Sequence, residues 1–315
     1  ALFDLGNAYA DLGDNAKRLE VLERAFPIFE REYGRDGAEI ARLLNNLGNA
    51  YMGLGDYAKQ RDVQEITLAI AEREYGENST QVAMTLGNLG NAYGYLGDNA
   101  KKRDVLERAL AINERAYGRD HAELGITLTN LGTAYGQLGD YAKARDMLER
   151  ALAIKERAYG HDHPEVAKTL MNLGIAYGAL GDYAKARDIQ ELVLAIQERA
   201  YGRDHPEVAE TMFNLGNVHV ALGDKAKACE LLERVLPIWT RAYGNDHPHT
   251  KLCQRQLTEL ATVQFDPMSL LTDLLLARED EADDEQDECK MSAPDLGFQI
   301  AVDGLRNMPS KSRGL

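Results

Sequence analysis

The chain has 315 residues, of which 44% are hydrophobic and only 8 are prolines, so it can bury a large core. Its formal net charge of -15 argues against nucleic acid as a partner, because phosphate binding needs clustered lysine and arginine, and it favours a basic ligand. The sequence contains no run of about 18 apolar residues, which excludes a membrane-spanning helix.

The three cysteines, Cys229, Cys253 and Cys289, do not have the spacing of a disulfide framework. Unpaired cysteines suit a reducing compartment, and we predict a cytoplasmic protein. The chain begins at Ala1 without a methionine, and its first residues already have the pattern of a helix interior. We therefore expect a fragment of a longer protein.

An internal repeat organises most of the chain. A Leu-Gly pair occurs six times, each 42 residues after the last, from Leu5 to Leu215. Leu-Gly-Asp and Tyr-Gly recur in the same register, beginning at Leu12 and Tyr33. Units of this length stack on their neighbours, so one array can exceed the usual domain size of about 150 residues.

The fifth unit shows why each repeat should form two helices. His163 can cap the first helix, Pro164 suits its first turn, and apolar residues then follow at three- and four-residue steps until Gly181. Asp182 can cap the second helix, and Gly202 supplies a left-handed end. We predict helices of about 17–19 residues. Each hairpin has an apolar face that only the next hairpin can cover.

The spacing Leu-Gly-x-x-Tyr, followed by Gly-Asp-Tyr and alanine, resembles the tetratricopeptide repeat. The 42-residue length and the junction Tyr-Gly-x-Asp-His-Pro-Glu-Val-Ala resemble the kinesin light chain and nephrocystin-like variety. The resemblance covers residues 1–264 and implies an all-α fold, an α-solenoid of stacked antiparallel helix hairpins in a right-handed superhelix. We expect six 42-residue units and a capping helix that begins near His247.

The resemblance also implies a small residue where the second helix of each unit crosses the glycine of the first. Alanine stands there in the last three units, whereas the first three units carry Arg18, Gln60 and Lys102. Because these side chains have long stems, we expect them to point outward and to widen the crossing slightly.

The two ends depart from the repeat. The first unit lacks most of its first helix, which should leave an apolar face uncovered and offer a surface for self-association. Residues 265–315 lack the repeat and are predicted to be an acidic, largely disordered tail. Its stretch from Ser269 to Arg278 is able to form one short amphipathic helix.

The candidate binding surface follows from the resemblance, which places the first helix of each unit on a concave, ligand-binding side. The residue before the Leu-Gly leucine is asparagine in five units, and a ladder of carboxamides can pair with the backbone of an extended peptide. Alternatively, these asparagines tie neighbouring helices together. The predicted groove comprises Asn45, Asn46, Asn49, Asn88, Asn91, Asn130, Thr133, Lys168, Met171, Asn172, Ile175, Phe213, Asn214 and Asn217.

The groove composition gives a first idea of the ligand. Met171, Ile175 and Phe213 are expected to form an apolar patch that gives side-chain selectivity. Arg42 and Lys168 are the only clear basic residues near the helix starts, too few for an acidic ligand. A mixed or basic apolar peptide is the better expectation.

Sequence features that suggest chemistry have structural explanations. The pairs His161-x-His163 and His247-x-His249 lie at the recurring helix junction, without four ligands at zinc spacing. No nucleophile, kinase or metalloprotease motif is present. We predict no catalytic residues, no metal and no cofactor.

These observations predict a scaffold or adaptor that binds an extended peptide or a partner helix in its groove, with neither nucleic acid nor membrane as a partner. The alternative is a regulatory or sensor part of a larger signalling protein, whose catalytic or nucleotide-binding domain would precede Ala1. The upstream sequence would separate the two hypotheses.

Overall fold

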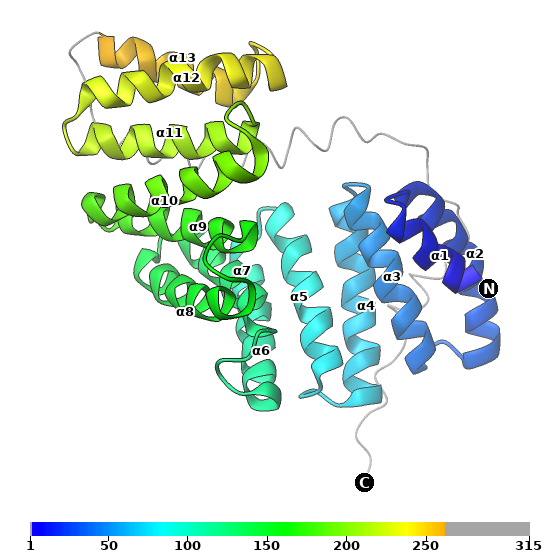
Figure 1. Ribbon diagram of the computed structural model, residues 1–315. Helices are drawn as coiled ribbons and strands as arrows, with labels where there is room; N and C mark the ends of the chain where they lie inside the picture. The colour runs from blue at the N-terminus through cyan, green and yellow to red at the C-terminus, as the bar shows by residue number, and fades with distance from the viewer. Residues whose placement is uncertain (1, 262–315) are drawn as a thin grey trace. The chain divides into compact units, whose positions relative to one another are not determined.

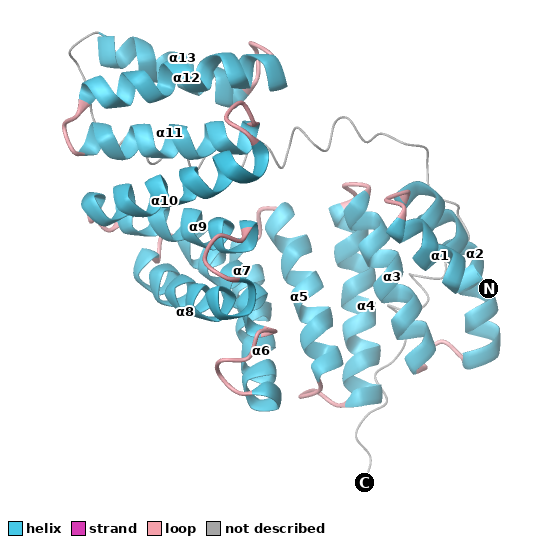
Figure 2. Cartoon of the chain, in the orientation of Figure 1, coloured by secondary structure: helices cyan, strands magenta, loops and turns pink. Residues whose placement is uncertain are grey.

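The computed structural model describes residues 2–261, and within this range all regular secondary structure is α-helical (Figures 1 and 2). The described chain divides into two units, the first ending at Ala116 and the second beginning at Tyr117. The helices of the first unit are α1 (Leu2–Asp11), α2 (Asn15–Tyr33), α3 (Ala38–Gly53), α4 (Tyr57–Tyr75), α5 (Thr80–Tyr95) and α6 (Asn99–Tyr117), which ends at the boundary.

The second unit continues the same alternation of first and second helices. Each helix from α1 to α5 in the first unit, and each helix of the second unit, packs against its neighbour in sequence, so the hairpins stack in sequence order within each unit. The prediction of an all-α solenoid of antiparallel hairpins is therefore confirmed. Its helices are α7 (Leu124–Gln137), α8 (Tyr141–Tyr159), α9 (Pro164–Ala179), α10 (Tyr183–Tyr201), α11 (Pro206–Ala221), α12 (Lys225–Tyr243) and α13 (Pro248–Ala261).

Local chemistry sets the helix ends. At the start of α10, the Asp182 side chain accepts a hydrogen bond from the N–H of Lys185, and Gly202 ends the helix with φ 89°. At the start of α9, the N–H of Glu165 donates to Nδ1 of His163. These predicted caps are confirmed. The second helices have 19 residues, whereas α9 has 16 because the Leu-Gly-Asp turn follows directly.

The contacts of the repeated glycines correct one prediction. The side chain nearest to the Leu-Gly glycine is that of the residue 16 positions later, as Leu148 is for Gly132, whereas the position held by Lys102 contributes at most a backbone oxygen. Lys102 is only 9% exposed and Gln60 is fully buried, so the prediction that these long side chains point outward is wrong. Lys102 has room because it lies over Gly94, which has no side chain.

Substituting Gly132 tests this close approach. A Cβ there would lie 2.6 Å from Cγ of Leu148 and 3.2 Å from the backbone oxygen of Ala144, so Gly132→Ala is expected to destabilise the fold by about 1–3 kcal/mol. The control is Gly87→Ala, since nothing lies within 4 Å of its Cβ and alanine is the better helix former. Thermal unfolding checks the pair, and equal midpoints would contradict the packing.

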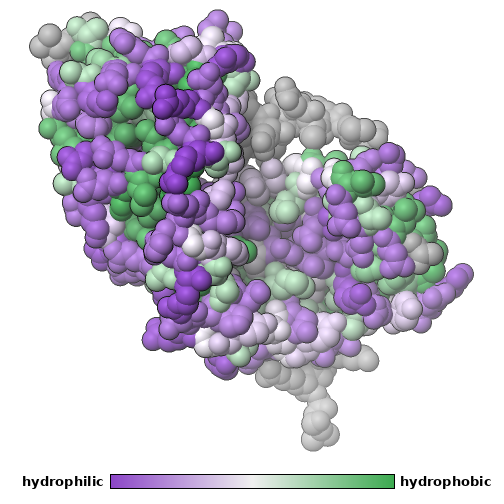
Figure 3. All heavy atoms as spheres, in the orientation of Figure 1, coloured by the Kyte–Doolittle hydropathy of each residue, from purple (hydrophilic) through white to green (hydrophobic). Residues whose placement is uncertain are grey.

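The two ends of the described chain differ in how they are covered. Helix α13, the expected capping helix, buries Leu252 and Cys253 in the cluster that contains Trp239 of α12. At α1, Leu5 is 42% exposed although the equivalent leucines of later hairpins are buried, and apolar side chains reach the surface over α1 and α2 (Figure 3). Self-association through this face stays a prediction. The predicted tail and the array limit at residue 264 lie outside the described residues.

Candidate functional site

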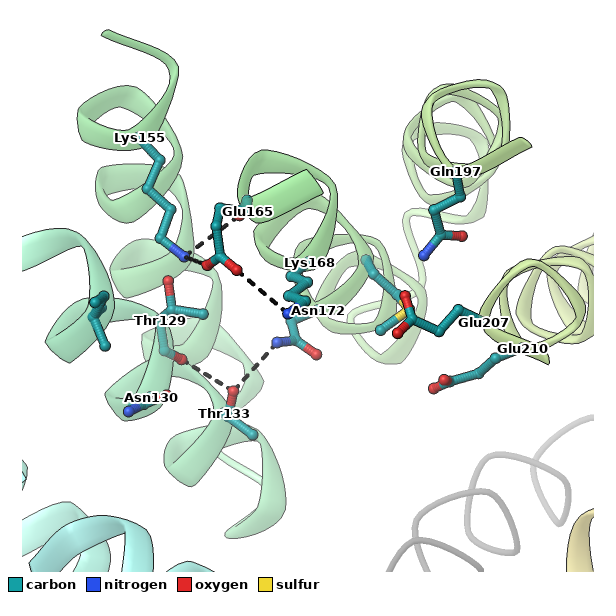
Figure 4. Close-up of a pocket in the computed structure, with 12 residues that line it drawn as sticks. Thr129, Asn130, Thr133, Lys155, Glu165, Lys168, Asn172, Gln197, Glu207 and Glu210 are labelled. Carbon is teal, nitrogen blue, oxygen red and sulfur yellow. Dashed lines mark hydrogen bonds and ion pairs between the residues drawn. The ribbon is translucent and has the colours of Figure 1, made fainter. Parts of the chain in front are cut away.

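In the second unit, a pocket opens beside the middle of α9, between α7 and α11 (Figure 4). We call it the α9 pocket, and its volume is about 410 Å³. It brings together five of the predicted groove residues. These are Asn130 and Thr133 from α7 and Lys168, Met171 and Asn172 from α9. A smaller cavity of about 50 Å³ adjoins Thr133 and Asn172 and is lined also by Ile175.

The first unit has a corresponding pocket of about 350 Å³. Asn45 and Asn46 of α3 line it, together with Phe3 of α1 and Met84 of α5. Arg42 also lines this pocket, and its guanidinium lies 5.3 Å from the centre of the Phe3 ring while it pairs with Glu39 at 2.9 Å. Both units therefore place first-helix residues of the predicted groove around an open pocket.

Several predicted groove residues also connect neighbouring first helices. Nδ2 of Asn88 donates to Oδ1 of Asn45 over 2.9 Å, which joins α5 to α3. Nδ2 of Asn172 donates to Oγ1 of Thr133 over 3.3 Å, which joins α9 to α7. These contacts agree with the alternative hypothesis, in which the asparagines tie neighbouring helices together. The binding of a peptide backbone by the same row stays a prediction.

The predicted groove fails at α11. Phe213 is 2% exposed and its ring centre lies 5.0 Å from that of Trp239, so the prediction that it forms part of an accessible apolar patch is wrong. Asn214 is 5% exposed, and both side-chain polar atoms of Asn217 are buried. Trp239 explains the difference for Phe213, because its large indole fills the space beside α11.

The remaining predicted residues, Asn49, Asn88 and Asn91, are half-buried and do not line the pockets described above. They lie on the same first helices, α3 and α5, as the residues that do.

The second helices contribute residues that the sequence reasoning missed. Lys155 of α8 and Gln197 of α10 line the α9 pocket, and they occupy the same repeat position, 42 residues apart. Trp239 occupies this position in the next unit, and Ala71 holds it in the first-unit pocket. The residue type at this position differs between units although most of the repeat is copied. That variation could have predicted a contact with a ligand from the sequence alone.

An ion-pair cluster forms one wall of the α9 pocket (Figure 4). Lys155 is 4% exposed, and its Nζ lies 3.4 Å from Oε2 of Glu165. Oε1 of Glu165 lies 3.3 Å from Nζ of Lys168. Burial lowers the pKa of Lys155, although Glu165 opposes that shift. Burial would raise the pKa of Glu165, but Lys155 and Lys168 outweigh it and hold this pKa below its usual value.

Residues 2–261 contain no group of three or more His, Cys, Asp or Glu side chains arranged to hold a metal ion. In the same range, no helix combines the length and the apolar character needed to cross a membrane.

Comparison with solved structures shows similar solenoids. BtubC (BKLC) from P. vanneervenii has 23% identity and a TM-score of 0.58 over 71% of this chain and 88% of that chain. The nearly identical TPR-like repeats of a candidate kinesin light chain from Podosopora anserina have 25% identity and a TM-score of 0.55 over 64% of this chain and 97% of that chain.

A third structure is a STAND signal-transduction ATPase with a tetratricopeptide repeat sensor from Pyrococcus horikoshii. It has 18% identity and a TM-score of 0.62 over 96% of this chain and 43% of that chain, a similarity that shows the fold alone. No curated protein matches the sequence. The tetratricopeptide repeat model matches residues 1–59, 39–101, 103–157, 137–199 and 165–238, and a second model of this repeat matches 82–123. Because the repeat model matches most of the chain and the structure has the helix-hairpin fold, the chain belongs to the tetratricopeptide repeat family.

Proposed function

We propose that the chain is a protein-interaction scaffold that binds extended peptide segments across the first helices of its hairpins. Tetratricopeptide repeats generally mediate protein–protein interaction, which supports the class of function. The observation that supports this site is the α9 pocket, where Asn130, Thr133 and Asn172 from two neighbouring first helices face one open cavity. Amide and hydroxyl groups spaced along such a surface can pair with a peptide backbone whatever its side chains.

Asn172 shows how one side chain can hold the wall and still contact a ligand. Its Nδ2 is engaged by Thr133, whereas its Oδ1 has no hydrogen-bond partner among residues 2–261. A peptide N–H could therefore donate to this oxygen without breaking the bond between α9 and α7. The hydrogen bond from Asn172 to Thr133 would also fix the geometry of the site.

Replacing Asn130 and Asn172 together by alanine tests the proposal. Peptides would first be selected on the wild-type protein from a random displayed library, then synthesised and titrated by fluorescence anisotropy. Losing two hydrogen-bonding amides is expected to weaken their affinity by about tenfold, because each net hydrogen bond contributes about 0.5–1.5 kcal/mol. Circular dichroism should show an unchanged helix content.

The matched control is Asn245→Ala with Gln254→Ala, which removes two exposed amides that do not line the pockets described above. If the asparagines only connect helices, Asn130→Ala with Asn172→Ala will lower the unfolding temperature and leave peptide affinity unchanged. Failure to enrich any peptide on the wild-type protein would remove the proposed function itself.

The regulatory or sensor alternative remains a prediction. The resemblance to the STAND ATPase is one of fold and does not favour it over the scaffold.

A further inference from the structure

The α9 pocket is acidic on the side formed by α11. Among its lining residues, the carboxylates of Glu165, Glu207 and Glu210 face the ammonium groups of Lys155 and Lys168, which gives a net charge of -1. Glu165 lies within 3.4 Å of both ammonium groups. Glu165 therefore offsets one of the two positive charges, and the α11 carboxylates make the lining as a whole net negative.

Glu207 is the uncommitted carboxylate. It is half-buried in the first turn of α11, and its side chain makes no hydrogen bond or ion pair with the part of the chain that the structure describes. It acts on Lys168 only through longer-range attraction. Figure 4 shows Glu207 and Glu210 extending from α11 on the side of the pocket opposite Lys155. A cation placed there would meet the Glu207 carboxylate.

Gln197 points to a ligand independently of these charges. Its side chain is 3% exposed and lines the pocket, and its carbonyl oxygen accepts a hydrogen bond from Oγ1 of Thr211. Its amide nitrogen has no hydrogen-bond acceptor among residues 2–261. Figure 4 shows the amide directed toward the side of Glu207. This nitrogen lines the pocket and can donate to a ligand there, so the site is suited to a ligand that supplies an oxygen.

Apolar and acceptor groups complete the wall. Met171 is half-buried in the pocket lining, and Ile126 of α7 is 61% exposed at the same pocket, so together they offer an apolar contact. Oδ1 of Asn172 adds an acceptor to the same lining. The pocket thus presents one donor, one acceptor, an apolar surface and the Glu207 carboxylate.

We infer that the α9 pocket selects extended peptide segments that carry an arginine or lysine beside an apolar residue. This inference rests on the proposed peptide-binding function. The cationic side chain lies against Glu207, a backbone carbonyl accepts from the Gln197 amide, and a backbone N–H donates to Asn172. The neighbouring apolar side chain contacts Met171. Acidic segments are disfavoured, because the pocket lining has a net charge of -1 and the Glu207 carboxylate repels a further anion.

Pools of immobilised peptides test the selectivity directly. Each pool contains random peptides of about twelve residues with one fixed central residue, which is Arg, Lys, Gln or Glu. The Arg and Lys pools are expected to retain about three- to fivefold more full-length protein than the Gln pool, the gain typical of one partly exposed ion pair. The preference should shrink between about 0.05 M and 0.3 M salt, because solvent-exposed ion pairs are screened.

The variant Glu207→Gln keeps the size of the side chain and removes its charge, so it should reduce the preference for Arg and Lys over Gln. The matched control is Glu233→Gln, an exposed glutamate of α12 outside the pocket, which should leave the preference unchanged. Greater retention on the Glu pool, equal retention on all pools, or an unaltered preference in Glu207→Gln would each overturn the inference while leaving peptide binding intact. No retention on any pool would overturn the proposed function as well.

Discussion

Replacing Phe213 by alanine is expected to destabilise the second unit by about 3–5 kcal/mol, the cost of truncating a buried phenylalanine and leaving a cavity. Phe213 is 2% exposed and packs on Trp239 at a ring-centre distance of 5.0 Å, inside the cluster that joins α11, α12 and α13. Urea denaturation followed by circular dichroism measures the loss. Trp239 is the only tryptophan of the chain, so its fluorescence reports on the same cluster.

The comparison with Met171→Ala decides between a core and a groove position for Phe213. Met171 is half-buried at the α9 pocket, so its truncation leaves a surface that water can fill and should cost clearly less. If Phe213 lined an accessible groove, the two variants would have similar unfolding free energies. Because the hairpins of a solenoid are stabilised by their neighbours, the milder Phe213→Leu provides a measurable midpoint if the alanine variant loses its C-terminal helices.

Substituting Lys102 by methionine is expected to stabilise the first unit at pH 7 by on the order of 3 kcal/mol, since each pKa unit corresponds to about 1.4 kcal/mol. Lys102 is 9% exposed on α6, and burial lowers its pKa from 10.5 to about 8. The charged form is therefore disfavoured in the folded state. Methionine has a similar shape and carries no charge.

The pH dependence of this stabilisation has a definite sign. Below pH 8, Lys102 is protonated in both states, and the penalty for burying the charge is fully present. Between pH 8 and 10.5 the unfolded chain holds the proton more tightly than the folded chain, so wild-type stability gains relative to the methionine variant as pH rises. The advantage of Lys102→Met should thus shrink over this range.

Urea denaturation at pH 7, 8.5 and 10 should show the unfolding free energies of the wild type and Lys102→Met approaching each other as pH rises. The neighbouring Lys101→Met is the control, because that side chain is 62% exposed and its truncation should change stability little. An advantage of Lys102→Met that stays constant across the three pH values would mean that the charge of Lys102 is not what the substitution removes.

The α9 pocket shows how repeats of one family could differ in the segments that they bind. A scaffold built from copied repeats presents similar backbone geometry at every hairpin, so selectivity has to come from positions that differ between copies. Lys168 and Glu210 occupy the same repeat position in successive units, yet they carry opposite charges at one pocket. A segment bound in this pocket would meet opposite charges at that position of α9 and α11.

The sequence by itself determined the repeat, the helix hairpins and their ends. The capping of α10 depends on Asp182 and Lys185, three residues apart, and the stop depends on the positive φ that Gly202 tolerates. Such interactions are local, so a pattern of residue types predicts them. The same holds for the placement of Asn130 and Asn172 on one face of the first helices.

The tertiary structure decided which of these residues face a ligand. Lys155 and Gln197 come from second helices and reach the α9 pocket only because neighbouring hairpins pack, and Trp239 buries Phe213 although the repeat pattern places Phe213 on the groove side. A 42-residue period fixes the position of a residue within its own hairpin, but accessibility depends on the volume of side chains from the adjoining hairpin, which the period does not encode.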